Sequence, residues 1–304
     1  MSCIQSHAVL NMLAWFFALI QKQWQEVFYM RLDKYLAEMS YGTRNEVKKI
    51  IRSGSVTING VQVLKPETKV DELADIVYIG EERVSYSQYV YYMLNKPAGC
   101  VSATKDDMHR TVIDLLKENA GNNTRDGIFP AGRLDIDTEG LVLLTNNGRL
   151  AHMLLSPHRH VDKAYYLVAD GVITEEGIRQ ITEGIDIGDG TLTLPARAEN
   201  IKVCKFGELG EYVQKIIKDR NNAGISLQSL DKVFTSMELV LHEGRYHQVK
   251  RMVEAAGSKV LYLKRIRMGT LLLDETLLPG ECRELLPEEA SGLEKLQICS
   301  FYKD

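Results

Sequence analysis

The sequence predicts an α+β protein in which a small helix–helix–hairpin module precedes a larger domain with a mixed, largely antiparallel sheet. Three observations support this prediction. The 304 residues exceed the length of one average domain. A capped amphipathic helix and a tight-hairpin signature stand together near the start of the chain. Further along, strand and helix patterns follow one another without the regular alternation of βαβ units. We therefore expect an N-terminal extension over residues 1–29, the module over 30–88 and the larger domain over 89–304.

The second helix of the module is the clearest local pattern in the chain. Thr43 and Glu46 have the spacing of a capping box, an apolar face follows them, and Gly54 stands where the helix should end. Next, two β-branched runs flank Asn59-Gly60, a residue pair typical of a two-residue hairpin turn. After the hairpin we expect a last strand at 75–79 and a polar linker at 80–88.

The charge of the chain is unevenly distributed. Its formal net charge is −4, so any affinity for nucleic acid must come from local patches. In the second helix, Arg44, Lys48 and Arg52 recur every four residues and form a stripe beside the apolar face. Such a stripe is either a solvated helix face or an RNA-binding surface, and the spacing leaves both open. The module has seven basic residues between positions 31 and 65 against three acidic ones, namely Arg31, Lys34, Arg44, Lys48, Lys49, Arg52 and Lys65.

The larger domain contains both strand and helix patterns. The strand patterns are short runs rich in β-branched and aromatic residues, and the helix patterns repeat apolar residues at helical spacing. We expect strands at 89–94, 141–144, 164–168, 237–241 and 259–263, and helices at 112–118, 175–182 and 248–256.

Composition and spacing argue against several other classes of protein. The apolar run Val9–Ile20 is shorter than the roughly 20 residues of a spanning helix and lacks the flanks of a secretion signal. Residues 1–29 are then either an extension from an upstream start codon or a peripheral helix. The five scattered cysteines include no Cys-x-x-Cys pair, which favours a reducing, cytoplasmic setting. His158-Arg159-His160 is too sparse to indicate a metal site, and no nucleotide-cofactor signature follows a strand.

The most distinctive polar segment is Gly132–Gly140, which leads directly into the apolar run at 141–144. It contains three carboxylates, those of Asp135, Asp137 and Glu139. Loops that enter a core strand are held rigidly and often carry catalytic groups. Asp and Gly are also the usual residues of a turn. Spacing alone leaves both interpretations open and singles out none of the carboxylates.

Three short motifs mark the module as a recognisable type. They are Arg-Leu-Asp-Lys-Tyr-Leu at 31–36, Thr-Arg at 43–44 and Gly-x-Val-x-Ile-Asn-Gly at 54–60. Together they resemble the S4 RNA-binding domain, a family that presents its two helices and hairpin to RNA. Double-stranded RNA is recognised mainly through phosphates, 2′-hydroxyls and shape, which suits a basic helix stripe. The resemblance therefore favours RNA binding for the stripe.

Four segments of the larger domain form a second and more specific set. They are Asn-Lys-Pro-Ala-Gly at 95–99, Gly-Arg-Leu-Asp-x-Asp-Thr-x-Gly-Leu from 132, Lys-x-Tyr at 163–165, and Glu-Gly-Arg-Tyr-His-Gln-Val-Lys-Arg-Met at 243–252. They resemble the motifs of the pseudouridine synthases and, with the module in front, the RsuA-type family. The likeness covers residues 30 to about 296. The last segment is most similar to the branch that acts on small-subunit ribosomal RNA.

The resemblance implies an activity and a set of site residues. Enzymes of this family break the C1′–N1 bond of a uridine in RNA, rotate the flipped-out base and rejoin it through C5, with no cofactor and no metal. The implied roles are Asp135 as nucleophile, Lys250 as its cation partner, Tyr165 as the ring that stacks on the uracil and Arg133 in RNA handling, with Asp137 structural. The implied RNA-binding residues are Arg31, Lys34, Arg44, Lys48, Lys49, Arg52, Lys96, Arg245, Arg251 and Arg265.

The resemblance also implies partners and leaves alternatives. The expected partner is ribosomal RNA within a ribosomal assembly intermediate, and we expect a monomer without membrane association. A large-subunit RNA substrate is the alternative, and a non-catalytic S4 assembly factor is a further one, which the set of Asp135, Tyr165 and Lys250 argues against. One stretch, 202–232, departs from the family pattern. We interpret it as an inserted mobile loop, with a short basic helix at 212–218 as the other interpretation.

Overall fold

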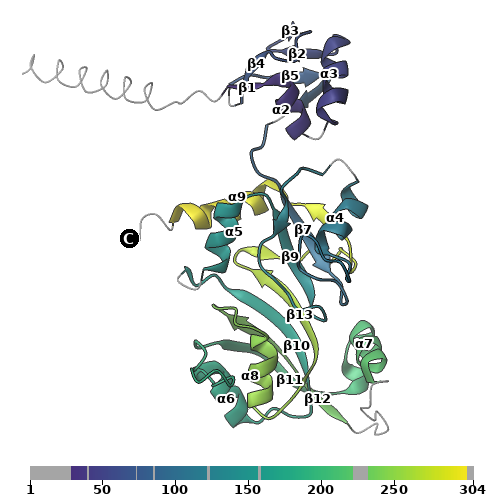
Figure 1. Ribbon diagram of the computed structural model, residues 1–304. Helices are drawn as coiled ribbons and strands as arrows, with labels where there is room; N and C mark the ends of the chain where they lie inside the picture. Colours follow the sequence, from purple (N-terminus) through teal and green to yellow (C-terminus); the bar gives the residue numbers. More distant parts are fainter. Residues whose placement is uncertain are drawn as a thin grey trace, which may run out of the picture. The chain divides into compact units, whose positions relative to one another are not determined.

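The computed structural model describes residues 29–39, 41–72, 74–84, 86–121, 124–156, 159–221 and 232–299 (Figure 1). They form two compact units that divide between Gln88 and Tyr89. Three of the expectations above lie outside the described residues, namely the extension before Tyr29, the apolar run Val9–Ile20 and the histidine at 158. None of the helices in the described part of the chain is long and apolar enough to cross a membrane.

The first unit has the predicted helix–helix–hairpin order. Its helices are α2 (Leu32–Glu38) and α3 (Arg44–Arg52), and the predicted capping box joins Thr43 to Glu46. Asn59 and Gly60 take the positive φ angles of 51° and 80° that the hairpin turn requires. The strands are β1 (Tyr29–Arg31), β2 (Val56–Ile58), β3 (Val61–Gln62), β4 (Lys69–Asp71), β5 (Val77–Ile79) and β6 (Glu82–Val84), with sheet orders β3-β2-β5-β6 and β1-β4.

One expectation for the first unit is wrong. The segment 80–88 was expected to be a linker, but β6 pairs with β5 inside it. The reason is a long-range contact, because Val84 is buried in the core of the unit and its carbonyl accepts a hydrogen bond from the Tyr35 hydroxyl at 3.1 Å. The two residues before Val84 in this strand are both polar, so the sequence shows no alternation of apolar and polar residues there.

The second unit is built on a nine-stranded sheet in the order β11-β12-β10-β13-β9-β7-β15, with β14 beside β13 and β8 beside β9. Among the strand pairs that the structure describes, only β13–β9 is parallel. The mixed, largely antiparallel sheet is therefore confirmed. The bounds are β7 (Tyr91–Lys96), β8 (Phe129–Pro130), β9 (Glu139–Thr145), β10 (Lys163–Asp170), β11 (Arg197–Lys205), β12 (Val233–Leu241), β13 (Val260–Met268), β14 (Leu271–Leu272) and β15 (Cys282–Glu284).

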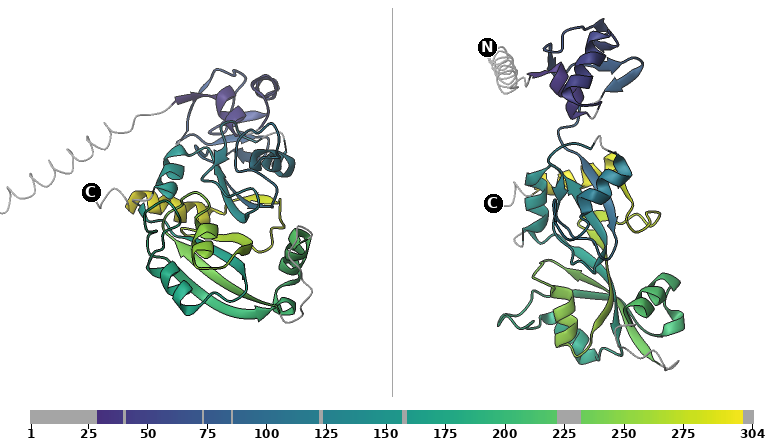
Figure 2. Two further views of the ribbon diagram at one scale, coloured as in Figure 1. Left: turned by 60° about the horizontal axis from the view of Figure 1, so that its bottom comes forward. Right: turned by 45° about the vertical axis from the view of Figure 1, so that its right-hand side comes forward.

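Helices cover both faces of this sheet. On one face α6 and α8 pack against Leu167, Leu239 and Leu263, and on the other α7 packs against Phe234 and Tyr262 (Figures 1 and 2). The five predicted strands and the three predicted helices of this unit are confirmed. The helices are α4 (Val112–Ala120), α5 (Gly148–Leu155), α6 (Glu175–Glu183), α7 (Glu211–Asn221), α8 (Gln248–Ala255) and α9 (Pro287–Cys299), of which α5 and α9 were not predicted.

The stretch 202–232 is more ordered than we expected. The end of β11, a short 3₁₀ helix (Phe206–Glu208) and α7 occupy it as far as 221, and 222–231 lie outside the described residues. Val213 and Ile217 are buried between α7 and the sheet. The interpretation as a mobile loop is therefore wrong for 202–221, and the helix extends beyond the predicted 212–218.

Candidate active site

The polar loop of the sequence analysis joins β8 to β9 in the middle of the sheet. At its end, β9 meets β13 so closely that a Cβ on Gly140 would lie 2.3 Å from the backbone oxygen of Arg265. Gly140 also has a φ of +98°, so only glycine fits there. The close approach places the residues before Gly140 at the parallel β9–β13 junction, where the loop leaves the sheet.

Lys96, at the end of β7, holds this loop in place through hydrogen bonds to its backbone. Its side chain is fully buried, and its Nζ donates to the carbonyl oxygens of Thr138 at 2.8 Å, Pro97 at 3.0 Å, Asp135 at 3.1 Å and Ile136 at 3.3 Å. Burial lowers the pKa of Lys96 to about 8. The expected RNA contact at Lys96 is therefore corrected, because an RNA phosphate has no access to this ammonium group. It fixes the backbone of the loop instead.

The loop presents Asp135 to a cation from α8. The Nζ of Lys250 lies 2.9 Å from Asp135 Oδ2 and 2.5 Å from Asp137 Oδ1. About a quarter of each of the Asp135 and Lys250 side chains is exposed, against about half of Asp137. Lys250 therefore bridges the two carboxylates, which are separated from it by more than a hundred residues of sequence. Asp137 shares the cation, a contact that the sequence did not indicate.

A second basic group lies next to Asp135. The Nε2 atom of His247 is 3.4 Å from Asp135 Oδ1, and the ring of His247 stacks on that of Tyr246 with centroids 3.8 Å apart. His247 is the N-cap of α8 and has a left-handed backbone with φ +49°. It stood inside the quoted motif but received no role there. An aromatic residue at a left-handed position is uncommon, and such positions cluster at functional sites.

Tyr165 lies on β10, on the sheet face that also carries α8. It pairs in register with Leu239 and Arg265, is half-buried, and packs against the apolar cluster that includes Leu134 of the loop. Its neighbour Tyr166 packs on the opposite face, edge-on to Tyr262, as the strand period requires. The loop that carries Asp135 thus contributes a residue to one of the clusters on which Tyr165 packs.

Arg133 and Arg265, two arginines expected to contact RNA, differ in exposure. Arg133 is exposed on the loop. Arg265 is only 2% exposed and its Nε donates to the carbonyl of Leu141 at 2.8 Å, so the expected RNA contact there is corrected to ordering of the strand. Beside it, Lys163 is also buried, and its pKa is lowered to about 8 by burial and by Arg265.

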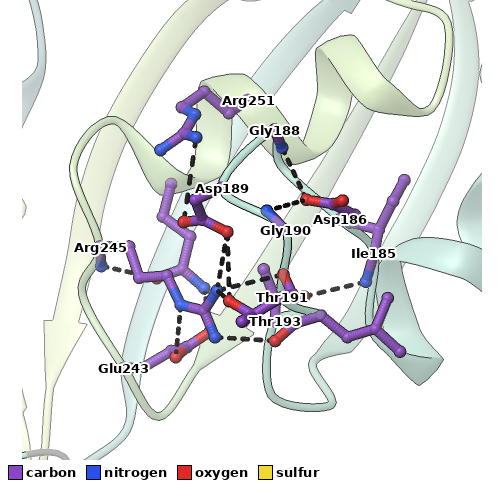
Figure 3. A network of polar contacts seen from close by, with 12 residues as sticks. Ile185, Asp186, Gly188, Asp189, Gly190, Thr191, Thr193, Glu243, Arg245 and Arg251 are labelled. Carbon is purple, nitrogen blue, oxygen red and sulfur yellow. Dashed lines mark hydrogen bonds and ion pairs between the residues drawn. The ribbon is translucent and has the colours of Figure 1, made fainter.

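Arg245 and Arg251 face the loop that connects α6 to β11 (Figure 3). The guanidinium of Arg245 donates to Leu192 O at 2.7 Å and Thr191 Oγ1 at 2.8 Å, and it pairs with Glu243. These donors hold the loop, and because about a quarter of the Arg245 side chain is exposed, its RNA contact stays a prediction. Arg251 is about a quarter exposed and lies 3.9 Å from Asp189.

The expected RNA-binding residues of the first unit lie mostly at its surface. Arg44, Lys49 and Arg52 are exposed and Lys48 is half-buried along α3. Arg31 donates twice to Asp33, at 2.9 and 3.0 Å, and this contact holds the pKa of the Asp33 carboxyl below its usual range. Lys34 pairs with Glu38 at 3.5 Å across one helical turn.

Comparison with known families agrees with this architecture. Residues 30–77 match the S4 domain, and residues 90–255, more than half of the chain, match the RNA pseudouridylate synthase family. The chain belongs to the RNA pseudouridine synthases. It is therefore an enzyme with an RNA substrate, and the predicted family, which names the S4 domain and the synthase domain together, is confirmed.

Three relatives and one solved structure match nearly the whole chain. An uncharacterised RNA pseudouridine synthase of Bacillus subtilis is 41% identical over 88% of this chain and 100% of its own length. Ribosomal small subunit pseudouridine synthase A is 35% identical in Vibrio cholerae and 34% in Escherichia coli, over 88% and 87% of this chain and 100% of each relative. A crystal structure of a pseudouridylate synthase superposes with a TM-score of 0.51 at 34% identity, covering 88% of this chain and 99% of that one.

Proposed function

We propose that this synthase converts one specific uridine of small-subunit ribosomal RNA to pseudouridine, with Asp135 as the reacting group. The observation that carries the proposal is the ion pair between Asp135 and Lys250 at the β9–β13 junction. The choice of ribosomal RNA rests on the likeness to the small-subunit synthases of Vibrio cholerae and Escherichia coli. The run Glu-Gly-Arg-Tyr-His-Gln-Val-Lys-Arg-Met supports the same choice.

The proposed chemistry needs Asp135 ionised in a partly buried place. Burial alone raises the pKa of a carboxyl group, and a cation at hydrogen-bond distance opposes that rise. Lys250 Nζ at 2.9 Å supplies the cation, and Lys96 keeps the loop backbone in place. An ionised Asp135 attacks C6 of the ring or the ribose C1′, or assists loss of the C2′ proton. In each route the C1′–N1 bond breaks, the base rotates and the C1′–C5 bond forms. The bond from Asp135 to C6 or C1′ breaks again, or the C2′ proton returns, and C5 loses its proton while N1 gains one.

The uracil must leave the RNA stack before Asp135 can reach it. Flipping a nucleotide out costs a few kcal/mol, and stacking on an aromatic side chain returns about 1–3 kcal/mol. We assign this contact to Tyr165, and its packing against the apolar cluster that includes Leu134 of the loop supports the assignment. The exposed Arg133 lies on the other side of Leu134 in sequence and would hold the RNA backbone or fill the vacated space.

The S4 domain would supply most of the affinity that does not depend on sequence. Arg44, Lys49 and Arg52 lie exposed on α3, and phosphate contacts of this kind make binding strongly dependent on salt. The proposed partner is ribosomal RNA in an assembly intermediate, and the synthase is proposed to act as a monomer in the cytoplasm.

The test is to map pseudouridines in ribosomal RNA from cells that lack this gene, and then to restore the wild type or Asp135→Ala. One small-subunit uridine should lose its modification in the deletion and regain it only with the wild type. RNA binding by purified Asp135→Ala should survive. A site in large-subunit RNA would refute the substrate choice, and restoration by Asp135→Ala would refute the role of Asp135.

A further inference from the structure

Tyr246 is an exposed aromatic residue beside the proposed reacting group. Its side chain is 74% exposed, whereas its ring stacks on His247 with centroids 3.8 Å apart and planes 19° apart. His247 in turn lies 3.4 Å from Asp135. One face of the Tyr246 ring is thus covered by His247, and the exposure of the residue leaves the other face to solvent.

The backbone beneath this pair is held in place on several sides. Arg245, the preceding residue, is bound by Asp189, Thr191 and the carbonyl of Leu192 in the loop between α6 and β11 (Figure 3). The Nη1 atom of Arg251 donates to the carbonyl oxygen of Tyr246 at 3.2 Å. These contacts maintain an exposed ring at a fixed place.

The loop that binds Arg245 is itself braced. The Asp186 carboxylate accepts hydrogen bonds from the backbone N–H groups of Gly188 at 2.8 Å and Gly190 at 3.2 Å (Figure 3). His247, which follows Tyr246, is the N-cap of α8 with a φ of +49°. The backbone on both sides of Tyr246 therefore belongs to defined structure.

We propose that the Tyr246–His247 stack is a platform for an unpaired nucleobase of the RNA that neighbours the target uridine. The inference rests on the proposed function and names a further substrate contact of that site. A flat, open, rigid ring near basic groups suits a nucleobase, because every base has a π-face and the phosphates beside it need cations. Arg251, which donates to the carbonyl oxygen of Tyr246 and is about a quarter exposed, is such a cation.

The base on this platform is distinct from the uracil that reacts. A base on the open face of Tyr246 is separated from His247, and from the carboxylate that His247 contacts, by the thickness of the tyrosine ring. Tyr165, on β10, is the ring assigned to the reacting uracil. The platform would therefore contribute to RNA affinity and to the choice of uridine through its neighbour.

The first experiment measures binding of the full chain to a transcript of complete small-subunit ribosomal RNA. Tyr246→Ala should raise the Kd about 5- to 100-fold, the range expected for one lost base stack. Tyr246→Phe should stay within about twofold of wild type, because stacking needs the ring, and Tyr246→Leu should resemble Tyr246→Ala. Val172→Ala, at an exposed turn after β10, is the matched control, and equal melting temperatures exclude a folding defect. Wild-type affinity for Tyr246→Ala, or loss of affinity in Tyr246→Phe, would overturn the proposal.

The second experiment identifies the ligand as a base. Single abasic sites are introduced, one nucleotide at a time, into a short RNA fragment that the wild type binds. One abasic position should weaken wild-type binding and leave Tyr246→Ala binding unchanged, and equal losses for both proteins at every position would refute the platform. Neither readout requires turnover. If the RNA gains no pseudouridine but this coupling is present, the proposed function fails and the platform stands.

Discussion

Two carboxylates four residues apart on the same loop have opposite surroundings. Asp135 is about a quarter exposed and faces the cation of Lys250 and the ring of His247. Glu139 is 2% exposed and accepts hydrogen bonds from the hydroxyls of Tyr262 at 3.0 Å and Tyr212 at 3.1 Å. The first environment pairs the acid with a cation and leaves it partly exposed, and the second encloses the acid with hydroxyl donors. Asp135 is thus available to react, whereas Glu139, at the start of β9, fixes the end of the loop to the sheet and is called the anchor below.

The anchor connects the proposed site to the far face of the sheet. Tyr262 is buried on β13, and burial together with Glu139 raises its pKa far above the usual range, so its hydroxyl remains a donor. Tyr212 belongs to α7, in the stretch that departs from the family pattern. Substitutions at Asp135 and its partners should therefore lower kcat most strongly. Substitutions at the partners of Glu139 should mainly make the loop less rigid.

The largest effect is expected from Asp135→Asn compared with Asp137→Asn. Both remove one charge from the pair that Lys250 bridges. Loss of the reacting group should lower kcat by at least about 10³-fold, whereas loss of the half-exposed Asp137 should cost about tenfold or less. Single-turnover formation of pseudouridine in the transcript measures both. Equal losses would mean that the pair, rather than Asp135 alone, carries the reaction.

The next effect concerns the cation. Lys250→Met should lower kcat about 100-fold, because it removes charge stabilisation of Asp135 and leaves two carboxylates close together. Lys250→Arg keeps the charge and should retain most of the activity. The kcat values of the two variants are compared with RNA affinity measured separately. A similar loss in both would show that the ammonium geometry matters rather than its charge.

Local patterns were enough to predict the two helices and the hairpin of the first unit, but in both units they missed elements that depend on distant contacts. The Thr43 capping box and the Asn59-Gly60 turn involve neighbours in sequence, so their structures followed from the residues themselves. Strand β6 and the packing of α7 depend on residues that are distant in sequence. The spacing of apolar residues within these two segments does not predict them. Both were missed or misinterpreted.

The candidate site could be predicted only through the family resemblance. Spacing alone did not separate Asp135 from its neighbouring carboxylates, and it could not place Lys250 beside it. Lys96 was expected to contact RNA, but it is fully buried, which is rare for a lysine. Four carbonyls around one ammonium group explain the exception, and they come together only after β7 and the loop have folded. His247 stood in a recognised motif, and its backbone conformation was the missing signal.

A smaller but broader effect is expected from Lys96→Met. The substitution leaves three loop carbonyls and that of Pro97 without their shared donor, so the free energy of unfolding should fall by about 2–3 kcal/mol. The kcat should fall about tenfold as Asp135 becomes less well placed. Urea denaturation and single-turnover assays measure the two effects, with the exposed Lys105→Met as control. Unchanged stability would contradict the role of Lys96 as an anchor.

Stability and activity should change in opposite directions as the pH rises above about 8. Burial lowers the pKa values of Lys96 and Lys163 from 10.5 to about 8. Between these values the unfolded chain holds protons that the folded chain has lost, so these two groups raise the free energy of unfolding as pH rises from about 8 to 10.5. Activity should fall over the same window, because neutral Lys96 donates fewer hydrogen bonds to the loop. Profiles of kcat and of urea stability test this, and a parallel fall of both above pH 8 would contradict it.

The smallest effect is expected at the far face, from Tyr212→Phe. The ring still packs edge-on to Tyr262, and only the hydroxyl that donates to Glu139 is lost. Since Tyr262 still donates to Glu139, the free energy of unfolding should fall by only about 1 kcal/mol. Tyr262→Phe removes the other, fully buried donor and should cost more. The kinetics of Tyr212→Phe show whether the Tyr212 hydroxyl helps to fix the loop or only packs. If it fixes the loop, kcat should fall and KM should stay unchanged. Identical kcat in Tyr212→Phe and wild type would confine α7 to stability and leave Tyr262 as the connection between Glu139 and the sheet.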